Sequence, residues 1–187
     1  MRRDDNGDAA RWNARYAARP PTFEPHPLVA EALAAGLPGG PVLELACGRS
    51  GSALTLARQG RRVIAVDVAD VGLRQLRAEA ERRGLAHRVC CVQADLGAGV
   101  PVRGAFALVL TTLFWDPDVY RLARRFVAPG GLLGWEALAW TEDGPTRYRA
   151  RQEDLVEPLR RWEELSREVT TGPGHPTVRV LARAPVT

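Results

Sequence analysis

The stretch Val42-Leu-Glu-Leu-Ala-Cys-Gly-Arg-Ser-Gly51 decides the fold of this chain. It opens as an apolar run that carries one carboxylate, Glu44, and then breaks into small residues that are typical of a tight turn. After the turn, apolar residues recur at helical spacing: Ala53, Leu54, Leu56 and Ala57. We therefore predict a strand at 41–46, a small-residue turn and a helix at 51–60.

This turn would bring bare backbone amides and the N-terminus of a helix close to a ligand. A second apolar run, 62–67, ends at Asp67, about twenty residues after the turn, where a carboxylate can accept hydrogen bonds from ribose hydroxyls. Together these features predict a site for an adenosine-containing cofactor. The spacing Ala46-x-Gly48-x-x-Gly51 also matches the dinucleotide fingerprint, so an NAD-binding oxidoreductase stays an alternative.

Strands and helices alternate along the rest of the chain, which predicts an α/β fold with a doubly wound parallel sheet. The further expected strands are 62–67, 88–93, 105–111 and 132–137, and the helices between them are 70–83 and 117–127. A short helix at 152–159 precedes two extended segments, 161–171 and 177–184, which are typical of a terminal hairpin. Ahead of the first strand we expect helices at 9–18 and 28–35, joined by a proline-rich crossing.

Composition excludes several classes of function. The 187 residues suit one domain, and they contain neither an apolar run of about 20 residues nor a signal-peptide core, so we expect a cytoplasmic protein without a membrane partner. Three cysteines are too few for a disulfide scaffold or a four-cysteine zinc site, and we expect no metal. All 26 basic residues are arginine and lie scattered among acids, which argues against a nucleic-acid partner. Without lysine, Schiff-base chemistry is excluded.

Five motifs in order resemble those of class I S-adenosylmethionine-dependent methyltransferases. The glycine-containing turn and the strand ending at Asp67 are similar to the first two motifs. Three further stretches of this chain are similar to the remaining motifs of the family. They are Cys91-Val-Gln-Ala-Asp95-Leu96, Phe106-Ala-Leu-Val-Leu-Thr-Thr112 and Val127-Ala-Pro-Gly-Gly-Leu-Leu133. The resemblance implies a Rossmann-like sheet of seven strands in the order 3-2-1-4-5-7-6, mostly parallel, with an antiparallel terminal strand.

The N-terminus narrows the resemblance. Trp12-Asn-Ala-Arg-Tyr16, followed by Phe23, resembles the first segment of small methyltransferases of the thiopurine and tellurite-resistance type. This implies a single domain over 1–187, in which residues 1–27 cap the active site and an insertion at 138–150 lies near the substrate pocket.

The resemblance also implies a set of residues that bind S-adenosylmethionine. Glu44 would reach the methionine amino group or the ribose, Asp67 the ribose hydroxyls, and Asp95 the adenine amine. For each carboxylate a structural role stays open. Glu44 could be a buried structural residue paired with another side chain, Asp67 could cap a helix, and Asp95 could cap a loop. The full predicted set is Trp12, Glu44, Ala46, Cys47, Gly48, Gly51, Asp67, Val68, Asp95, Leu96 and Thr111.

Two small residues stand where the family usually has glycine. Ala46 and Ser50 can keep the turn if their φ angles stay negative, and we expect this. The fourth strand lacks the acid that the family often places there, because Ala105 and Ala107 flank Phe106. This removes one candidate near the methyl group.

Aromatic and ionisable residues in loops are candidates for the acceptor site. Trp12, Tyr16 and Phe23 would wall the sulfonium, although packing of the first helix explains them equally well. Trp115 and Asp116 follow the fourth strand, where open α/β sheets bind ligands, but Asp116 also suits a helix cap. The predicted substrate residues are Tyr16, Phe23, Trp115, Glu136, Arg149 and His175, and the catalytic candidates are His26, Asp116 and Tyr148.

The predicted function is transfer of a methyl group to a small-molecule acceptor through a sulfur, selenium, nitrogen or oxygen nucleophile. Because the chemistry is an in-line displacement, the protein mainly positions two reactants. No candidate base stands out, which favours a soft or already ionised acceptor. Besides the NAD alternative, a non-catalytic module that binds the cofactor is a further reading. The expected oligomer is a monomer or homodimer.

Overall fold

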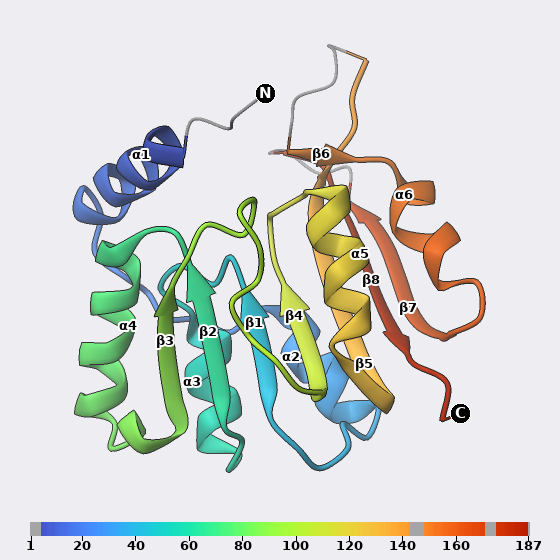
Figure 1. Ribbon diagram of the computed structural model, residues 1–187, viewed down its shortest axis with the longest axis horizontal. Helices are drawn as coiled ribbons and strands as arrows, with labels where there is room; N and C mark the ends of the chain where they lie inside the picture. Colours follow the sequence, from blue (N-terminus) through green and yellow to red (C-terminus); the bar gives the residue numbers. More distant parts are fainter. Residues whose placement is uncertain (1–4, 143–147, 171–174, 187) are drawn as a thin grey trace.

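A single mixed sheet organises the computed structural model, which describes residues 5–142, 148–170 and 175–186 (Figure 1). The strands run in the order β3-β2-β1-β4-β5-β8-β7, and β6 pairs with β5 beside this path. Their bounds are β1 Val42–Leu45, β2 Val63–Asp67, β3 Val89–Gln93, β4 Phe106–Thr111, β5 Val127–Ala139, β6 Arg149–Ala150, β7 Glu163–Thr170 and β8 Thr177–Arg183.

The predicted topology is confirmed, with one strand added. Strands β1 to β5 pair in parallel, whereas β8 pairs antiparallel with both β5 and β7. Leaving out the two-residue β6, the order is the expected one, in which the last strand of the chain lies between β5 and β7. The turn of the terminal hairpin, 171–174, lies outside the described residues.

Strand β5 begins earlier than predicted. The sequence Pro129-Gly130-Gly131 suggested a loop before the strand, but β5 already starts at Val127, which pairs with Phe106. The register of the pair shifts between Phe106 and Leu108, so the proline and glycines lie within an irregular stretch of the ladder. Gly131 fits there because a Cβ at this position would lie 2.9 Å from the carbonyl oxygen of Phe106.

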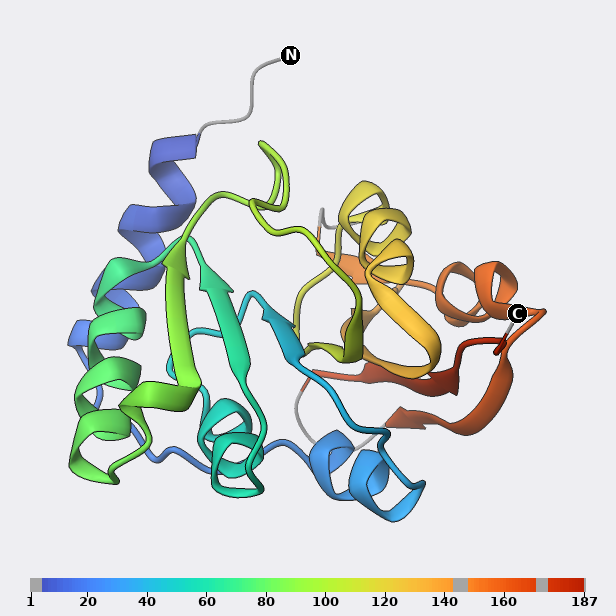
Figure 2. The same cartoon turned by 60° about the horizontal axis from the view of Figure 1, so that its bottom comes forward.

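Helices cover both faces of the sheet (Figures 1 and 2). One hydrophobic cluster joins the sheet to α2 (Pro27–Ala34), α3 (Gly51–Arg58) and α4 (Asp70–Arg82). A second joins its other face to α5 (Pro117–Arg125) and α6 (Gln152–Val156). Single 3₁₀ turns at Ala86–Arg88 and Glu157–Leu159 complete the elements. Because β1 and β4 lie between these layers, all their residues are buried, as their apolar sequences require.

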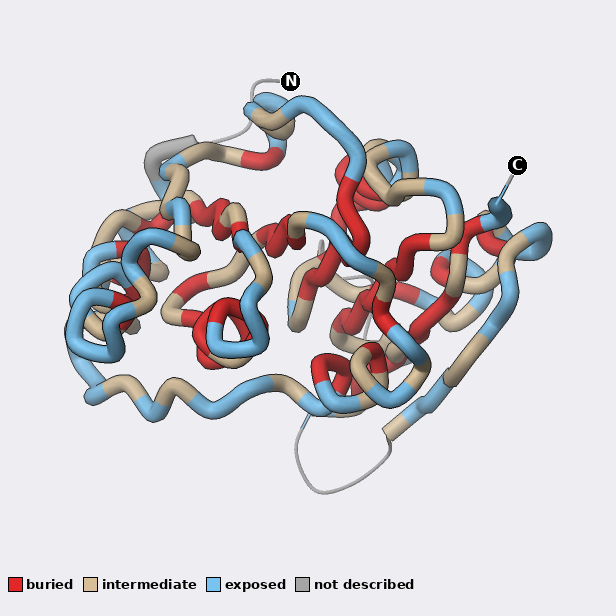
Figure 3. The backbone as a smooth tube through the Cα atoms, turned by 90° about the horizontal axis from the view of Figure 1, so that it is seen from below, coloured by how far each residue is buried: buried red, intermediate tan, exposed pale blue. Residues whose placement is uncertain are grey.

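The N-terminal segment reaches both edges of the sheet. Helix α1 (Asp5–Ala17) lies above the carboxyl ends of the strands and packs on α4 (Figure 1). Residues 18–26 then form a mostly exposed crossing to α2, which runs along the face of the domain that carries α2 and α3 (Figures 1 and 3). The crossing explains Gly51, because a Cβ there would lie 2.3 Å from the Phe23 carbonyl oxygen. Gly51 therefore makes room for the chain itself rather than for a ligand.

Residues 5–142, 148–170 and 175–186 contain neither a membrane-spanning helix nor a cluster of metal ligands. Over these residues, no helix is long and apolar enough to cross a membrane. In the same ranges, no group of three or more histidine, cysteine or acidic side chains is arranged to hold a metal ion.

Candidate active site

A cavity of about 570 Å³ opens at the carboxyl ends of the parallel strands. Its turn wall, which follows β1, β2 and β3, consists of Ala46, Cys47, Asp67, Val68, Ala94, Asp95, Leu96 and Gly97. Its α1 wall consists of Asp8, Arg11, Trp12, Arg15 and Tyr16. Its β4–β5 wall consists of Thr112, Leu113, Phe114, Trp115, Asp116, Leu138, Tyr148 and His175. The volume lies within the range of about 300–1,000 Å³ that is typical of small-molecule sites.

The turn after β1 is more strained than the sequence suggested. Ala46 has a φ of 50°, in the left-handed region that favours glycine, so the expectation of a negative φ was wrong at this position. Ser50 has the expected negative φ, −72°. The strain arises because the chain must leave a buried strand and turn at once into α3, and Ala46 keeps the glycine-like geometry despite its Cβ.

Asp67 is the centre of the turn wall, and Gly48, which does not itself line the cavity, helps to hold it. The Gly48 amide donates to Asp67 Oδ2 at 2.7 Å, and the Ala69 amide donates to Asp67 Oδ1, also at 2.7 Å. The expected bare amide is therefore engaged at Gly48, because the second strand delivers its carboxylate to the turn. Burial raises the pKa of Asp67, while these amides oppose the rise. The Val68 amide also stabilises this carboxylate, so Asp67 is held by the backbone at the lip of the cavity.

Glu44 supports the turn through a hydrogen bond with Ser50 and does not line the cavity. It is buried, lies outside the cavity lining, and accepts from Ser50 Oγ at 2.7 and 2.8 Å. Ser50 in turn caps α3 by accepting from the Ala53 amide at 2.9 Å. Burial raises the pKa of Glu44 to about 8, against the Ser50 hydrogen bond. Glu44 thus has the buried partner, Ser50, that a structural role requires. Direct contact between Glu44 and the cofactor stays a prediction.

The outer part of the turn wall comes from the residues after β3. Asp95 lines the cavity and also closes its own loop, since Oδ1 accepts from the Gly97 amide at 2.8 Å. Leu96 beside it is almost fully buried and offers an apolar surface for a planar ring. In the same wall, burial raises the pKa of the Cys47 thiol well above its usual value, with Asp67 adding to the effect. Cys47 is therefore a neutral contact and not a nucleophile.

Helix α1 carries an aromatic side chain into the turn. A Cβ on Gly48, whose φ is 54°, would lie 2.3 Å from the Tyr16 hydroxyl, and a Cβ on Gly72 would lie 2.9 Å from the Tyr16 ring. Tyr16 therefore fits between the turn and α4 because both positions are glycine. Trp12 stacks on Tyr16 with ring centroids 5.8 Å apart. Tyr16 was predicted as a substrate residue, but the contact with Gly48 places it beside the turn wall.

The corner after β4 presents an apolar side chain to the cavity. Leu113 has a φ of 55° and is 55% exposed, which is unusual for a large apolar residue. The next residue is pinned, because the Phe114 carbonyl accepts from Trp135 Nε1 at 2.9 Å and the Phe114 amide donates to the Glu136 carbonyl at 3.4 Å. The pinned corner holds Leu113 in its strained conformation.

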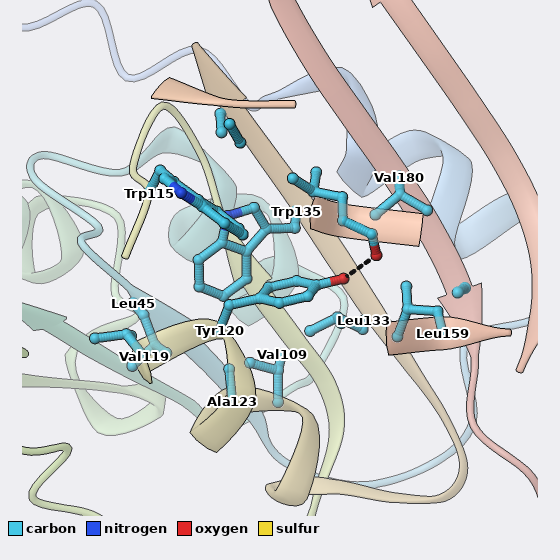
Figure 4. Packing of buried hydrophobic residues seen from close by; sticks show 14 of the residues in the cluster. Leu45, Val109, Trp115, Val119, Tyr120, Ala123, Leu133, Trp135, Leu159 and Val180 are labelled. Carbon is cyan, nitrogen blue, oxygen red and sulfur yellow. Dashed lines mark hydrogen bonds between the residues drawn. The ribbon is translucent and has the colours of Figure 1, made fainter. Parts of the chain in front are cut away.

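Trp115 and Asp116 combine lining and structural roles. Trp115 packs on Tyr120 and Trp135, with centroids 5.4 and 6.5 Å away, and the Tyr120 hydroxyl donates to the Leu155 carbonyl (Figure 4). Asp116 Oδ1 accepts from the first two amides of α5, at 2.9 and 3.0 Å. Asp116 is therefore a helix cap and lines the cavity as well, so both sequence-based readings of this residue describe real contacts.

Two walls meet across the cavity through Tyr148. Its hydroxyl lies 3.0 Å from both carboxylate oxygens of Asp8, which also pairs with Arg11 at 3.0 Å. The Arg11 guanidinium lies over the Tyr148 ring at 5.2 Å. These contacts join α1 to the segment before β6, whose residues 143–147 lie outside the described part. His175, just ahead of β8, is exposed at the rim.

Eight predicted site residues do not line the cavity: Phe23, His26, Glu44, Gly48, Gly51, Thr111, Glu136 and Arg149. His26 caps α2, and its Nε2 lies 2.5 Å from Glu136 Oε2. Strand alternation explains Glu136, since Trp135 and Ala137 belong to the cluster under α5 and Glu136 faces the opposite side, where α2 begins. Thr111 is fully buried and its neighbour Thr112 lines the cavity instead.

The sequence missed several lining residues: Asp8, Arg11, Arg15, Thr112, Leu113 and Phe114. Arg15 lies within the aromatic segment 12–16, so its position gave a signal that was not used. Leu113 gave none, because an isolated leucine after an apolar strand looks like core until the backbone is known.

The chain matches known methyltransferases in sequence and fold. Residues 42–131 match the family model described as a methyltransferase domain. 2-heptyl-1-hydroxyquinolin-4(1H)-one methyltransferase of Mycobacteroides abscessus is 32% identical over 108 residues, covering 56% of this chain and 47% of that protein. The chain thus spans about half the length of this curated relative.

Among solved structures, TehB from Haemophilus influenzae aligns with a TM-score of 0.77 at 19% identity, over 92% of this chain and 67% of that one. Magnesium protoporphyrin IX methyltransferase from Synechocystis, solved with bound SAH, aligns with a TM-score of 0.66 at 14% identity, over 98% and 89%. These likenesses show the fold. The chain is therefore similar to a methyltransferase domain over residues 42–131, and its fold is similar to that of TehB and of a methyltransferase solved with bound SAH, which agrees with the predicted class and cofactor.

Proposed function

We propose that the protein transfers the methyl group of S-adenosylmethionine to a heteroatom of a small, largely apolar acceptor. The observation that carries this proposal is the opposition of two walls in one cavity. Asp67 and Asp95 line one wall, whereas Leu113, Phe114 and Trp115 line the other. The first suits a nucleoside with hydroxyl and amine donors, and the second suits an apolar, flat molecule.

The residues present fit the cofactor. Asp67 would take the ribose hydroxyls, and Asp95 with Leu96 would hold the adenine. The relative from Mycobacteroides abscessus is named for a quinolone substrate with a flat ring system, which supports an aromatic acceptor here. When bound, S-adenosylmethionine supplies a methyl group on a positively charged sulfur, which an incoming lone pair can displace.

The contribution of the chain is to orient the two molecules and to exclude water. Tyr148 and Asp8 join two walls of the cavity, and the aromatic rings of Trp12 and Trp115 line it. Of the catalytic candidates, His26 lies outside the lining and Asp116 Oδ1 accepts from two amides. We therefore propose that the acceptor reacts as an anion or a soft neutral nucleophile, so that no enzyme base is needed.

The test has two stages. Calorimetric titration should show S-adenosylmethionine binding to the purified protein, weakened about 30-fold by Asp67→Asn because one hydrogen-bonding charge is lost, and no comparable binding of NADH. A mass-spectrometric screen of small aromatic thiols, phenols and N-hydroxy heterocycles should then find a product heavier by one methylene group. Cofactor binding without turnover of any acceptor class would favour the non-catalytic module, and NADH binding alone would favour the oxidoreductase.

A further inference from the structure

The cofactor brings one negative charge that the turn wall does not accommodate. S-adenosylmethionine carries a sulfonium, an ammonium and a carboxylate, and the carboxylate needs a positive partner when it leaves water. The charged residues of the turn wall are Asp67 and Asp95, both acidic. Buried Glu44 lies close enough to Asp67 to interact with it electrostatically. An anion bound here without a basic residue would face only like charges.

The nearest arginine in sequence is committed elsewhere. Arg49 follows Gly48, but its guanidinium donates to the backbone carbonyls of Tyr16 and Arg19, at 3.3 and 2.5 Å, and to the Gln75 side chain at 3.4 Å. Arg49 therefore anchors the end of α1, and it does not line the cavity.

The α1 wall contributes two arginines with different surroundings. Arg11 already pairs with Asp8 and lies over the Tyr148 ring. Arg15 forms no ion pair within the part of the chain that the structure describes, and its guanidinium lies 5.3 Å from the Trp12 ring centroid. Arg15 is thus the lining arginine whose charge is available to a ligand.

Tyr16 lies next to Arg15 and reaches the turn. Its hydroxyl lies against Gly48, where a Cβ would be only 2.3 Å away, and Tyr16 also lines the cavity. Burial raises the pKa of Tyr16 above its usual value, with Asp67 and Cys47 adding to the effect. The hydroxyl therefore stays protonated and can donate to a carboxylate.

Helix α1 is held in place before any ligand binds. Asn13 donates to Asp70 at 2.6 Å and accepts from the Val71 amide at 3.0 Å, and Gln75 donates to the Tyr16 carbonyl at 3.2 Å. With the Arg49 contacts, these bonds fix α1 against α4 and the turn, so little ordering cost falls on ligand binding.

We propose that Arg15 and Tyr16 bind the carboxylate of the methionine half of S-adenosylmethionine, which makes α1 part of the cofactor site and not only a cap on the acceptor. This inference rests on the proposed function. Arg15 supplies the charge and Tyr16 a neutral hydrogen bond from the side of the turn. The Trp12 ring lies beside both Arg11 and Arg15, and Arg15 itself is exposed to solvent.

The test compares a probe that carries the amino-acid half of the cofactor with one that lacks it. S-adenosylhomocysteine carries the carboxylate, and 5′-methylthioadenosine keeps the nucleoside and thioether without the amino acid. By calorimetry, Arg15→Met should weaken S-adenosylhomocysteine binding about 20-fold and 5′-methylthioadenosine binding less than about twofold. Tyr16→Phe should weaken only the former, by about threefold. Arg58→Met, at an exposed site on α3, should change neither.

Each result decides between named outcomes. Equal weakening of both probes would show a structural role and overturn the assignment, as would unchanged binding of S-adenosylhomocysteine by Arg15→Met. If the wild-type chain binds neither S-adenosylmethionine nor S-adenosylhomocysteine, the proposed function fails and the inference with it. If it binds both and only the Arg15→Met selectivity is absent, the proposed function stands and this inference alone is wrong.

Discussion

The turn wall and the β4–β5 wall of the cavity are built by different means. The turn wall comes from three short stretches that follow adjacent parallel strands, and backbone amides of Gly48 and Ala69 hold its central carboxylate. The β4–β5 wall collects side chains from four separated segments, 112–116, Leu138, Tyr148 and His175. A wall made by the main chain resists change, whereas a wall made by side chains can alter its specificity without loss of the fold.

Gly48→Ala should give the largest effect, because it changes the main chain of the turn wall. We expect a loss of about 3 kcal/mol in the free energy of unfolding, from the positive φ together with the clash against Tyr16. Urea denaturation measures this loss. Gly60→Ala is the matched control, since Gly60 also has a positive φ, 86°, but nothing lies within 4 Å of its missing Cβ. It should lose only about 1 kcal/mol. Equal losses would show that the Tyr16 contact is unimportant.

The buried carboxylate behind the turn predicts a pH dependence. Because the folded-state pKa of Glu44, about 8, lies above the ordinary 4.5, the folded state binds the proton more tightly. The contribution of Glu44 to stability is therefore fully present below about pH 4.5 and is lost as the pH rises to about 8. One such group contributes at most about 1.4 kcal/mol per pH unit.

Glu44→Gln should flatten the fall in unfolding free energy between these pH values, leaving the contribution of Asp67, whose pKa burial also raises. Urea unfolding at a series of pH values measures the slope. Glu153→Gln, at an exposed position on α6, should keep the wild-type slope. A variant at position 44 with that same slope would mean that Glu44 is ionised in the folded protein.

Leu113→Ala probes the β4–β5 wall and should separate the two halves of the site. Because Leu113 is 55% exposed, its removal should cost little stability. We expect KM for an apolar acceptor to rise about fivefold through lost contact area, with unchanged affinity for S-adenosylmethionine. Steady-state kinetics and calorimetry measure the two quantities. Val186→Ala, 76% exposed and away from the cavity lining, is the control. If only the affinity for S-adenosylmethionine changed, Leu113 would belong to the cofactor part of the site and not to the acceptor part.

Ala46→Gly should give the smallest effect and in the stabilising direction. Glycine adopts the φ of 50° without a Cβ clash, so the free energy of unfolding should rise by about 0.5–1 kcal/mol. Thermal and urea unfolding measure it. Ala35→Gly, at a φ of −74°, relieves no strain and should stabilise nothing. If Ala46→Gly is destabilising instead, packing of its methyl group outweighs the backbone strain.

Features that depend on residues close together in the sequence were predictable. The strand–turn–helix at 42–58 and the placement of Asp67 and Asp95 follow from apolar periodicity and the right-handed parallel crossover, which brings successive strand ends to one edge. The sequence likewise indicated that Asp116 could cap α5, because Pro117 follows it. The strain at Ala46 was not predictable, since no local rule reports a φ angle for alanine.

Contacts between distant segments decided the rest. His26 and Glu136 were separate candidates for the site, yet they pair with each other on the far face of the sheet, because strand alternation turns Glu136 away from the cavity. Gly51 read as a ligand-binding glycine, but the backbone of Phe23 and Glu24 crosses over it. Neither contact has a signal in the sequence around its members.

By itself, the sequence determined the class of fold and the position of the turn after β1, because both depend on local periodicity and on the order of strands. Only the tertiary structure decided which side chains face the cavity. Tyr16 reaches Gly48 because α4 leaves space at Gly72, and Tyr148 meets Asp8 across 140 residues of chain. Such contacts depend on where whole elements dock, and packing of the complete core sets that docking.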